Sequence, residues 1–255
     1  MFGFMRRRRT PKRHHARTPS PEEINHQLER FECLRLLNRD EQNRLRVKSA
    51  EILARMDFLG AKDYVPDYAA CLTVAAMTAL PLLNRRLSWL RDFRSFILYE
   101  ERFSAETTTV DDAGVVHRGR DLRAGEAWHR GPVVLAMSDV ERSGQGTGFN
   151  VVVHEIVHQI DYLNRDPDGF PPLPRSLSSD DWAEHFGAGY ALLQSQLQQH
   201  QQPWLDPYGA TNPAEFFAVC SECFFDLPVY LKQQQPELYR LLSAFFDQDP
   251  AARQT

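Results

Sequence analysis

Two histidines and a glutamate stand at a spacing that suits metal-dependent hydrolysis. The segment His154-Glu155-Ile156-Val157-His158 is an H-E-x-x-H motif inside an apolar run. Because positions i and i+4 of a helix lie on one face, His154 and His158 can bind one metal ion together. Glu155 stands beside the first histidine, where it can take a proton from a water molecule held by the metal. The spacing therefore predicts a zinc hydrolase, and a peptidase above other kinds.

The surroundings of the motif favour a metal over the alternative, which is a partly buried helix with two hydrogen-bonded histidines. Three valines precede His154, and Ile156, Val157 and Ile160 follow it. On such a largely buried helix each imidazole needs a strong partner. One metal ion is the simplest partner for two histidines four residues apart.

A catalytic zinc ion usually has three protein ligands and one water, so a third ligand is expected elsewhere in the chain. The extended H-E-x-x-H-x-x-G-x-x-H form is excluded, because Asp161 and Asn164 occupy the positions of its glycine and its third histidine. The downstream candidates are Glu184, His185, His200, Glu215 and Glu222.

Glu215 is the best of these candidates. It lies on a predicted helix over 213–225 whose other residues are mostly apolar, and a carboxylate on a buried helix needs strong compensation. With Asn212 as N-cap, Glu215 also occupies the N3 position of a capping box, so helix chemistry allows either role. Glu222 is seven residues further on and shares that face, which suits a residue that orients a histidine or the substrate. Glu184 lies on a more polar helix and is expected to be solvated.

Helices are expected to surround this site. Apolar residues at helical spacing predict a helical layer over 21–85, in which Asp40 caps the second helix and 68–83 forms a third apolar stretch. After the motif, Asp180 or Asp181 can cap a further helix. The layer is expected to cover the part of the chain that carries the site.

The segment between these helical regions has a strand signal. Residues 96–99 form a short apolar run, and 107–110 with 115–117 predict a hairpin around a turn at 111–114. A further strand is predicted over 131–138, followed by a polar, glycine-rich loop. This last strand could pair with an extended peptide substrate, because main-chain pairing at a sheet edge holds a peptide without demanding particular side chains.

Charge divides the chain into a tail and a body. Residues 1–20 carry seven Lys/Arg and no acid, which predicts a disordered basic tail, whereas all 34 acids lie in the remaining residues. We therefore expect a single domain over 21–250 that does not bind nucleic acid directly.

The location of the protein is expected to be cytoplasmic, with no membrane association. No apolar run approaches the roughly 20 residues that a membrane helix needs. The first residues place their charges after a very short apolar piece, the opposite order to a secretory signal. Cys220 and Cys223 form a C-x-x-C inside an apolar helical stretch, where buried thiols are expected rather than a metal or redox role.

Three segments in order resemble the Mlc titration factor A (MtfA) family of bacterial metallopeptidases. They are 150–161 around the H-E-x-x-H motif, 208–219 around the candidate third ligand, and 125–133 before the last predicted strand. The likeness covers roughly residues 20–250. It implies an α+β, zincin-like metallopeptidase fold, mostly helical with a small mixed β-sheet next to the H-E-x-x-H helix.

The resemblance also implies roles for single residues. It implies one zinc ion per chain, bound by His154, His158 and Glu215. Glu155 would be the general base and later the proton donor. Tyr208 matches a tyrosine that is thought to stabilise the transition state in this family and in the similar anthrax lethal factor catalytic domain. Asp161 matches an acid three residues after the second histidine, and both a supporting role and a plain surface position are open for it.

Three functions are consistent with these implications. The first is a zinc metallopeptidase, of aminopeptidase type, that acts on a peptide or protein substrate and is linked to the regulation of sugar uptake. The second is a regulatory protein, because family members bind and inactivate the repressor Mlc; peptidase activity would then be secondary to sequestration of an Mlc-type repressor. The third is a zinc hydrolase for a non-peptide amide or ester, which a panel of substrates would separate.

Overall fold

The structure, a computed structural model, describes residues 17–101, 104–110, 116–122, 125–127, 131–164 and 166–254. Most of the predicted basic tail and the predicted turn at 111–114 lie outside these residues. The last tail residues lie within them: Ser20 caps the first helix, and Arg17 forms an ion pair with Glu23. No helix in the described part of the chain is both long and apolar enough to span a membrane.

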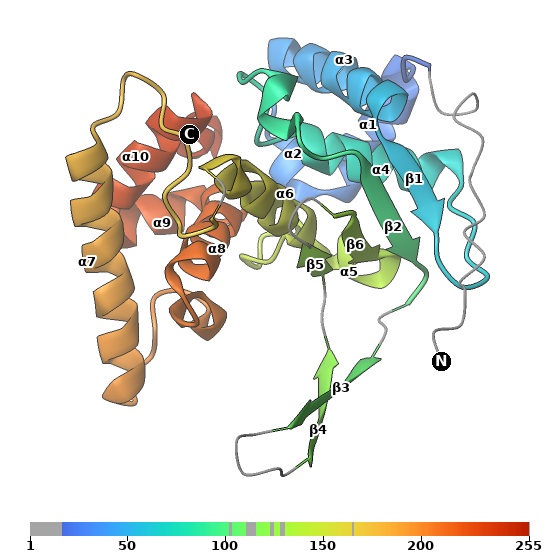
Figure 1. Cartoon of the computed structure of the whole chain (residues 1–255). Helices are drawn as coiled ribbons and strands as arrows, with labels where there is room; N and C mark the ends of the chain where they lie inside the picture. Colours follow the sequence, from blue (N-terminus) through green and yellow to red (C-terminus); the bar gives the residue numbers. More distant parts are fainter. Residues whose placement is uncertain are drawn as a thin grey trace.

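The chain is mostly helical, and its strands form one small sheet and one hairpin (Figure 1). The α-helices are α1 (Pro21–Arg30), α2 (Glu32–Arg35), α3 (Arg39–Arg55), α4 (Tyr68–Ala79), α5 (Met137–Arg142), α6 (Val151–Asp161), α7 (Ser179–Gln198), α8 (Pro213–Asp226), α9 (Pro228–Gln234) and α10 (Pro236–Phe246). The strands are β1 (Asp57–Gly60), β2 (Ser95–Tyr99), β3 (Ser104–Val110), β4 (Val116–Leu122), β5 (Gly125–Ala127) and β6 (Val133–Ala136). Short 3₁₀ helices are η2 (Leu87–Leu90), η3 (Tyr162–Asn164), η4 (Pro207–Ala210) and η5 (Pro250–Gln254).

The sheet is small and mixed, as predicted. Its strand order is β1-β2-β6-β5; the first three strands are parallel, and β5 runs antiparallel to β6. Both β5 and β6 contact α6, so the sheet lies next to the H-E-x-x-H helix. The predicted hairpin is also present, because β3 and β4 pair antiparallel up to Val110 and Val116. The α+β fold expected from the sequence is confirmed.

Two expectations about the last strand are wrong. The predicted strand over 131–138 ends at Ala136, and α5 begins at Met137. The reason is a change of period, since Met137 and Val140 are both buried three residues apart, as in a helix. Nor is β6 free to pair with a peptide, because β2 and β5 occupy its two sides. The edge strand on this side of the sheet is β5.

The N-terminal helices form the predicted layer over the sheet and α6. Helix α4 is its buried member; all its residues from Cys71 to Ala79 are buried, and it contacts both α3 and α6. The N-cap of α3 is Asn38 rather than the predicted Asp40. The Asn38 side chain accepts hydrogen bonds from two backbone amides, and Asp40 lies in the first turn, where a negative charge favours the helix dipole.

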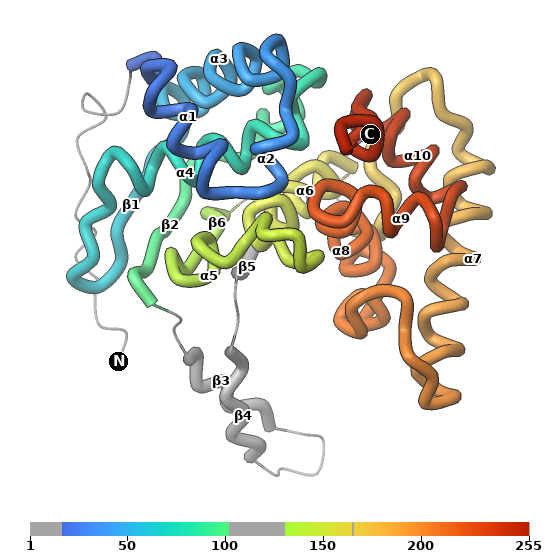
Figure 2. Tube along the Cα trace, turned by 180° about the vertical axis from the view of Figure 1, so that it is seen from behind, coloured from blue at the N-terminus to red at the C-terminus, as the bar shows by residue number. Residues whose placement is uncertain are grey.

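The C-terminal helices pack on the other side of α6. In Figures 1 and 2, α7, α9 and α10 lie on the far side of α6 and α8 from the sheet and α1–α4. Their core is aromatic, with Trp182 of α7 in ring contact with Phe217 of α8 and Phe245 of α10. Helix α7 is capped by Ser178, not by the predicted Asp180 or Asp181, which lie in its first turn.

The four cysteines are buried and free, as expected for structural thiols. Burial raises the pKa of Cys223 to about 12 and that of Cys220 well above its usual value. Burial therefore favours the neutral thiol at both positions.

Candidate metal centre

Helix α6 places the side chains of His154 and His158 next to each other. Its N-cap is Asn150, whose side chain accepts from the Val153 amide at 3.1 Å. The apolar residues of α6 are buried against the sheet and α4, which fixes the rotation of the helix about its axis. The rings of His154 and His158 consequently face the same side, with their centroids 4.8 Å apart.

Helix α8 brings the third candidate ligand to the same point. Asn212 caps this helix and Pro213 begins it, as predicted. The Asn212 side chain accepts from the Glu215 amide at 3.0 Å, while the Glu215 carboxylate faces the histidines of α6. Of the two roles that the sequence left open, the structure therefore places the carboxylate of Glu215 next to the H-E-x-x-H histidines.

The three candidate ligand atoms form a nearly equilateral triangle. Oε2 of Glu215 lies 3.0 Å from Nε2 of His154 and 3.2 Å from Nε2 of His158, and the two Nε2 atoms are 3.1 Å apart. Ligand atoms about 2.1 Å from one tetrahedral zinc ion lie about 3.4 Å from one another. The observed triangle is slightly smaller, so small side-chain shifts would fit it to this ion. Two imidazoles and one carboxylate are also donors that zinc accepts.

Glu222 orients the first histidine. Its Oε1 lies 2.7 Å from Nδ1 of His154, and its Oε2 accepts from the backbone amide of Asn150. A proton held on Nδ1 by this carboxylate would leave Nε2 as the atom that binds a metal. Glu222 of α8 thus contacts both the N-cap of α6 and the ring of His154.

The protonation states of His154 and Glu215 depend on each other. Burial lowers the pKa of His154, but the carboxylates of Glu222 and Glu215 outweigh it and hold this pKa well above its usual value. Burial likewise raises the pKa of Glu215, but hydrogen bonds with the two imidazoles outweigh it and hold that pKa well below its usual range. Without a metal, proton sharing between imidazole and carboxylate stabilises the group. A metal ion would displace that proton, so metal binding is expected to weaken at low pH.

Glu155 lies beside these residues on the inner side of α6. It is 4% exposed, and burial raises the pKa of its carboxyl. Within the described residues, its Oε2 makes no hydrogen bond. A buried carboxylate oxygen without a protein partner, next to a candidate metal group, is available to hold and move a proton.

Tyr208 is brought to the rim of the group by η4. Its ring centroid lies 6.0 Å from that of His154, and its side chain is 54% exposed. Asp206 caps η4, and the hydroxyl of Tyr190 donates to the carbonyl of Ala210 at 3.1 Å, which fixes the turn against α7. The tyrosine is therefore accessible to a substrate while its backbone is held in place.

Asp161 supports the candidate metal site indirectly, through the loop after α6. It is buried rather than on the surface, and its Oδ2 accepts from the amide of Gly169 at 2.8 Å. Gly169 has φ +76°, and a Cβ at this position would lie 2.4 Å from the carbonyl oxygen of Pro213, the first residue of α8. Asp161 thereby seats the loop after α6 against the start of the helix that carries Glu215. Burial raises its pKa to about 6.

A third carboxylate on α8, that of Asp226, was missed by the sequence reasoning. Asp226 accepts from the amides of Gly146 at 3.0 Å and Gly148 at 2.6 Å, and so fixes the loop that leads into α6. Gly144, Gly146 and Gly148 all have positive φ, which explains why this loop is rich in glycine. The i, i+7, i+11 spacing of Glu215, Glu222 and Asp226 on one helix was the available signal.

The other sequence candidates do not reach the metal group. Glu184 is exposed on α7, and His185 forms an ion pair with Asp181 one turn earlier. His200 lies beyond the end of α7 with φ 55°. Among the described residues, only His154, His158 and Glu215 place three potential ligand atoms close enough to hold one ion.

Fold and site together define an α+β metallopeptidase with an H-E-x-x-H helix and a glutamate from a second helix. The chain belongs to the family described as glucose-regulated metallo-peptidase M90, whose sequence model matches residues 4–247.

Proteins called Mlc titration factor A are similar to it over most of its length. That of Serratia proteamaculans (strain 568) is 36% identical over 221 residues, which cover 85% of this chain and 84% of the relative. That of Pectobacterium atrosepticum is 34% identical over 206 residues, covering 77% of each. That of Escherichia coli O17:K52:H18 is 31% identical over 222 residues, covering 86% and 84%. The predicted membership of the MtfA family is confirmed, whereas the similarity to the anthrax lethal factor catalytic domain stays a prediction.

Proposed function

We propose that this protein is a zinc-dependent peptidase in which His154, His158 and Glu215 hold one zinc ion. The observation that carries the proposal is the triangle of two Nε2 atoms and one Oε2, with sides of 3.0 to 3.2 Å. Membership of a metallo-peptidase family supports the metal and the reaction class. The two-imidazole, one-carboxylate donor set supports zinc among the metals.

Glu155 acts as the general base. When bound, zinc lowers the pKa of water toward about 7 and polarises the scissile carbonyl. Glu155 takes the proton of the attacking water and returns it to the leaving amine. Its burial and raised pKa favour the protonated carboxyl needed in the second half of this cycle.

Tyr208 donates a hydrogen bond to the developing oxyanion. It is exposed at the rim, 6.0 Å ring to ring from His154, so a bound carbonyl can lie between it and the metal group. The resemblance to the MtfA family favours an aminopeptidase, which removes residues from the amino end of a peptide. The edge strand β5 replaces β6 as the element on which an extended peptide would pair.

The decisive experiment measures zinc content and peptide hydrolysis in parallel. Glu155→Gln is expected to keep one zinc ion per chain and to lose at least about a hundredfold in kcat. His158→Ala and Glu215→Ala are expected to lose zinc and activity together. Glu184→Ala, which changes an exposed acid of α7, is the control. Full zinc retention in Glu215→Ala would overturn the ligand set.

A second function is favoured by the name of the relatives. They are called titration factors of Mlc, and a protein of this kind in the cytoplasm would regulate sugar uptake by sequestering an Mlc-type repressor. Glu155→Gln separates the two functions, because it removes hydrolysis and leaves the surface intact. Repressor binding that survives in Glu155→Gln would make sequestration independent of peptidase activity.

A further inference from the structure

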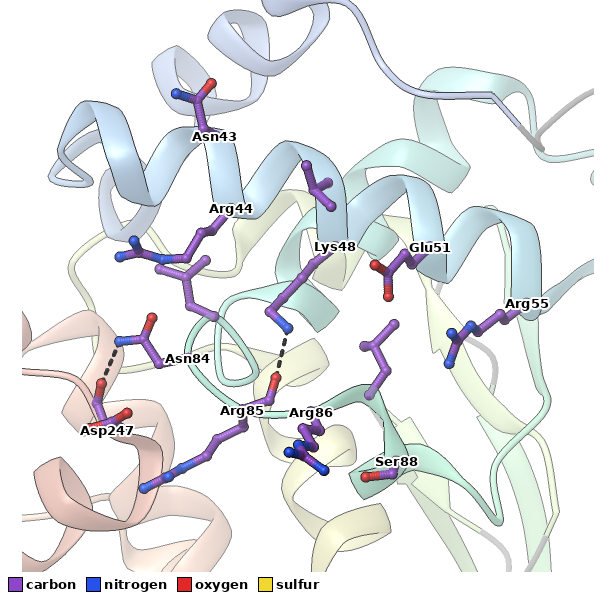
Figure 3. Close-up of a pocket in the computed structure, with 13 residues that line it drawn as sticks. Asn43, Arg44, Lys48, Glu51, Arg55, Asn84, Arg85, Arg86, Ser88 and Asp247 are labelled. Atoms are coloured by element: carbon purple, nitrogen blue, oxygen red, sulfur yellow. Dashed lines mark hydrogen bonds between the residues drawn. The ribbon is translucent and has the colours of Figure 1, made fainter.

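A cationic groove lies on the N-terminal helical layer, apart from the metal group. It runs between α3 and the chain around η2 and has a volume of about 990 Å³ (Figure 3). None of the residues that line it belongs to the metal group. Its lining includes five basic and two acidic residues, although the chain as a whole has a net charge of −4.

The basic residues of α3 form a stripe. Arg44, Lys48 and Arg55 stand at i, i+4 and i+11, so they share one face of the helix. In Figure 3 Lys48 extends to the opposite wall, which carries Arg85 and Arg86, and Arg44 and Arg55 lie to either side of it along α3. Within the described residues, no ion pair or side-chain hydrogen bond engages Arg44, Arg55 or Arg86, and all three are exposed. Three guanidinium groups thus face one groove without protein partners there.

The walls of the groove are fixed by other contacts. Arg85 donates from Nε to the carbonyl of Phe245 at 2.7 Å and so ties this wall to the end of α10. Lys48 donates to the carbonyl of Arg85 at 2.6 Å, which links α3 to the same wall. Asn84 donates to the carbonyl of Asp247. The groove is therefore preformed, and the free arginines project from a rigid base.

One exposed apolar side chain accompanies the charges. Val47 of α3 is 47% exposed in the groove, whereas Leu83 and Leu87, which also line it, are buried. A small inorganic anion such as phosphate has no apolar group that could contact the exposed Val47. A peptide segment that alternates carboxylates with aliphatic side chains would use both the arginines and Val47.

We propose that this groove binds an extended acidic segment of a partner protein. From Arg44 to Arg55 the helix rises about 16 Å, the length of about five residues of extended chain. Charge complementarity selects an acidic segment, and the exposed Val47 selects one with aliphatic residues. A long nucleic acid suits the site less well, because the rest of the domain carries an excess of acid that would repel it.

The test is fluorescence anisotropy with a short labelled peptide of alternating glutamate and leucine. It is made with the full chain and repeated with Glu155→Gln, so that cleavage of the probe cannot imitate its release. The triple variant Arg44→Glu, Arg55→Glu, Arg86→Glu is expected to bind at least about tenfold more weakly than wild type. The control variant Arg35→Glu, Arg94→Glu, Arg175→Glu makes the same change in net charge at exposed positions outside the groove, and it should bind as wild type does.

The contribution of Val47 is tested separately. Val47→Ser should weaken binding of the glutamate–leucine peptide but not of a glutamate–glycine peptide. Equal losses in the two triple variants would overturn the proposal, since net charge alone would then explain binding. Tighter binding of a single-stranded oligonucleotide than of the peptide, lost in the groove variant, would assign the groove to nucleic acid instead. Thermal unfolding of each variant checks that it folds.

Discussion

The Oε1 atom of Glu222 lies 2.7 Å from Nδ1 of His154, although 68 positions separate the two residues. The same carboxylate accepts from the amide of Asn150, the N-cap of α6. Glu222 therefore sets both the tautomer of His154 and the beginning of the helix that carries it.

Replacing Glu222 by alanine should weaken zinc binding without removing a ligand. Loss of a carboxylate that orients a metal-binding histidine costs about 10- to 100-fold in metal affinity. Competition titration against a chromogenic chelator measures this, with Glu184→Ala as the exposed-acid control. Glu222→Gln keeps an acceptor for the Nδ1–H of His154, so its zinc affinity should lie between those of Glu222→Ala and the control. Unchanged affinity in Glu222→Ala, with the fold intact, would contradict the orienting role.

Replacing Tyr208 by phenylalanine should reduce turnover but not metal content. If the hydroxyl stabilises the developing oxyanion, kcat should fall about 10- to 1,000-fold, while KM and zinc content change little. Tyr230→Phe is the matched control, because the hydroxyl of Tyr230 donates to the carbonyl of Trp204 at 2.7 Å and has no proposed catalytic role. A fall in zinc content in Tyr208→Phe would instead indicate that the tyrosine supports the metal group.

Replacing Gly169 by alanine should destabilise the protein by about 2 kcal/mol or more. The position has φ +76°, which costs a residue with a side chain about 1–2 kcal/mol, and its Cβ would meet the Pro213 carbonyl oxygen at 2.4 Å. Gly187→Ala is the control, because this exposed helical position has nothing within 4 Å. It should leave stability unchanged or raise it by up to about 1 kcal/mol. Urea unfolding measures the free energy of unfolding of each variant. Equal changes in Gly169→Ala and Gly187→Ala would show that neither the positive φ nor the contact with Pro213 restricts position 169.

The buried carboxyl of Asp161 should make stability depend on pH in a defined window. Burial raises its pKa to about 6, whereas the unfolded chain should have a value near about 3.9. The folded state therefore holds the proton more tightly, so stability falls as pH rises from about 4 to about 6, by on the order of 3 kcal/mol. Asp161→Asn keeps an acceptor for the Gly169 amide and removes the titration.

The difference in unfolding free energy between Asp161→Asn and wild type isolates this effect from other titrating groups. As pH rises from about 4 to about 7, the variant should become more stable relative to wild type by a few kcal/mol. A difference that is the same at both pH values would mean that the carboxyl is not buried in the way described.

Much of the site could be predicted from local sequence, because its parts are helical. The i, i+4 spacing of His154 and His158 places both on one face of any helix that contains them. Asn212 and Pro213 mark the start of α8 by the same local rules. Local competition also explains the errors. Asn38 and Ser178 satisfy backbone amides in the first turns of α3 and α7, so the aspartates predicted as caps are the second or third residues of those helices.

Other features depended on contacts between distant parts of the chain. The sequence left Glu215 with two possible roles and Asp161 with a surface or a supporting position. Packing of α8 on α6 directs the Glu215 carboxylate to the histidines, and burial of the loop at Gly169 makes Asp161 a structural acceptor. The pairing of β5 on β6 likewise decided which strand is the sheet edge.

By itself, then, the sequence determined a short set of candidate metal ligands and the helices that carry them, because spacing and capping are local properties. Only the tertiary structure decided how those helices meet. A single pair of side chains, such as Glu222 and His154, is brought together by the burial of many apolar residues that no short motif contains.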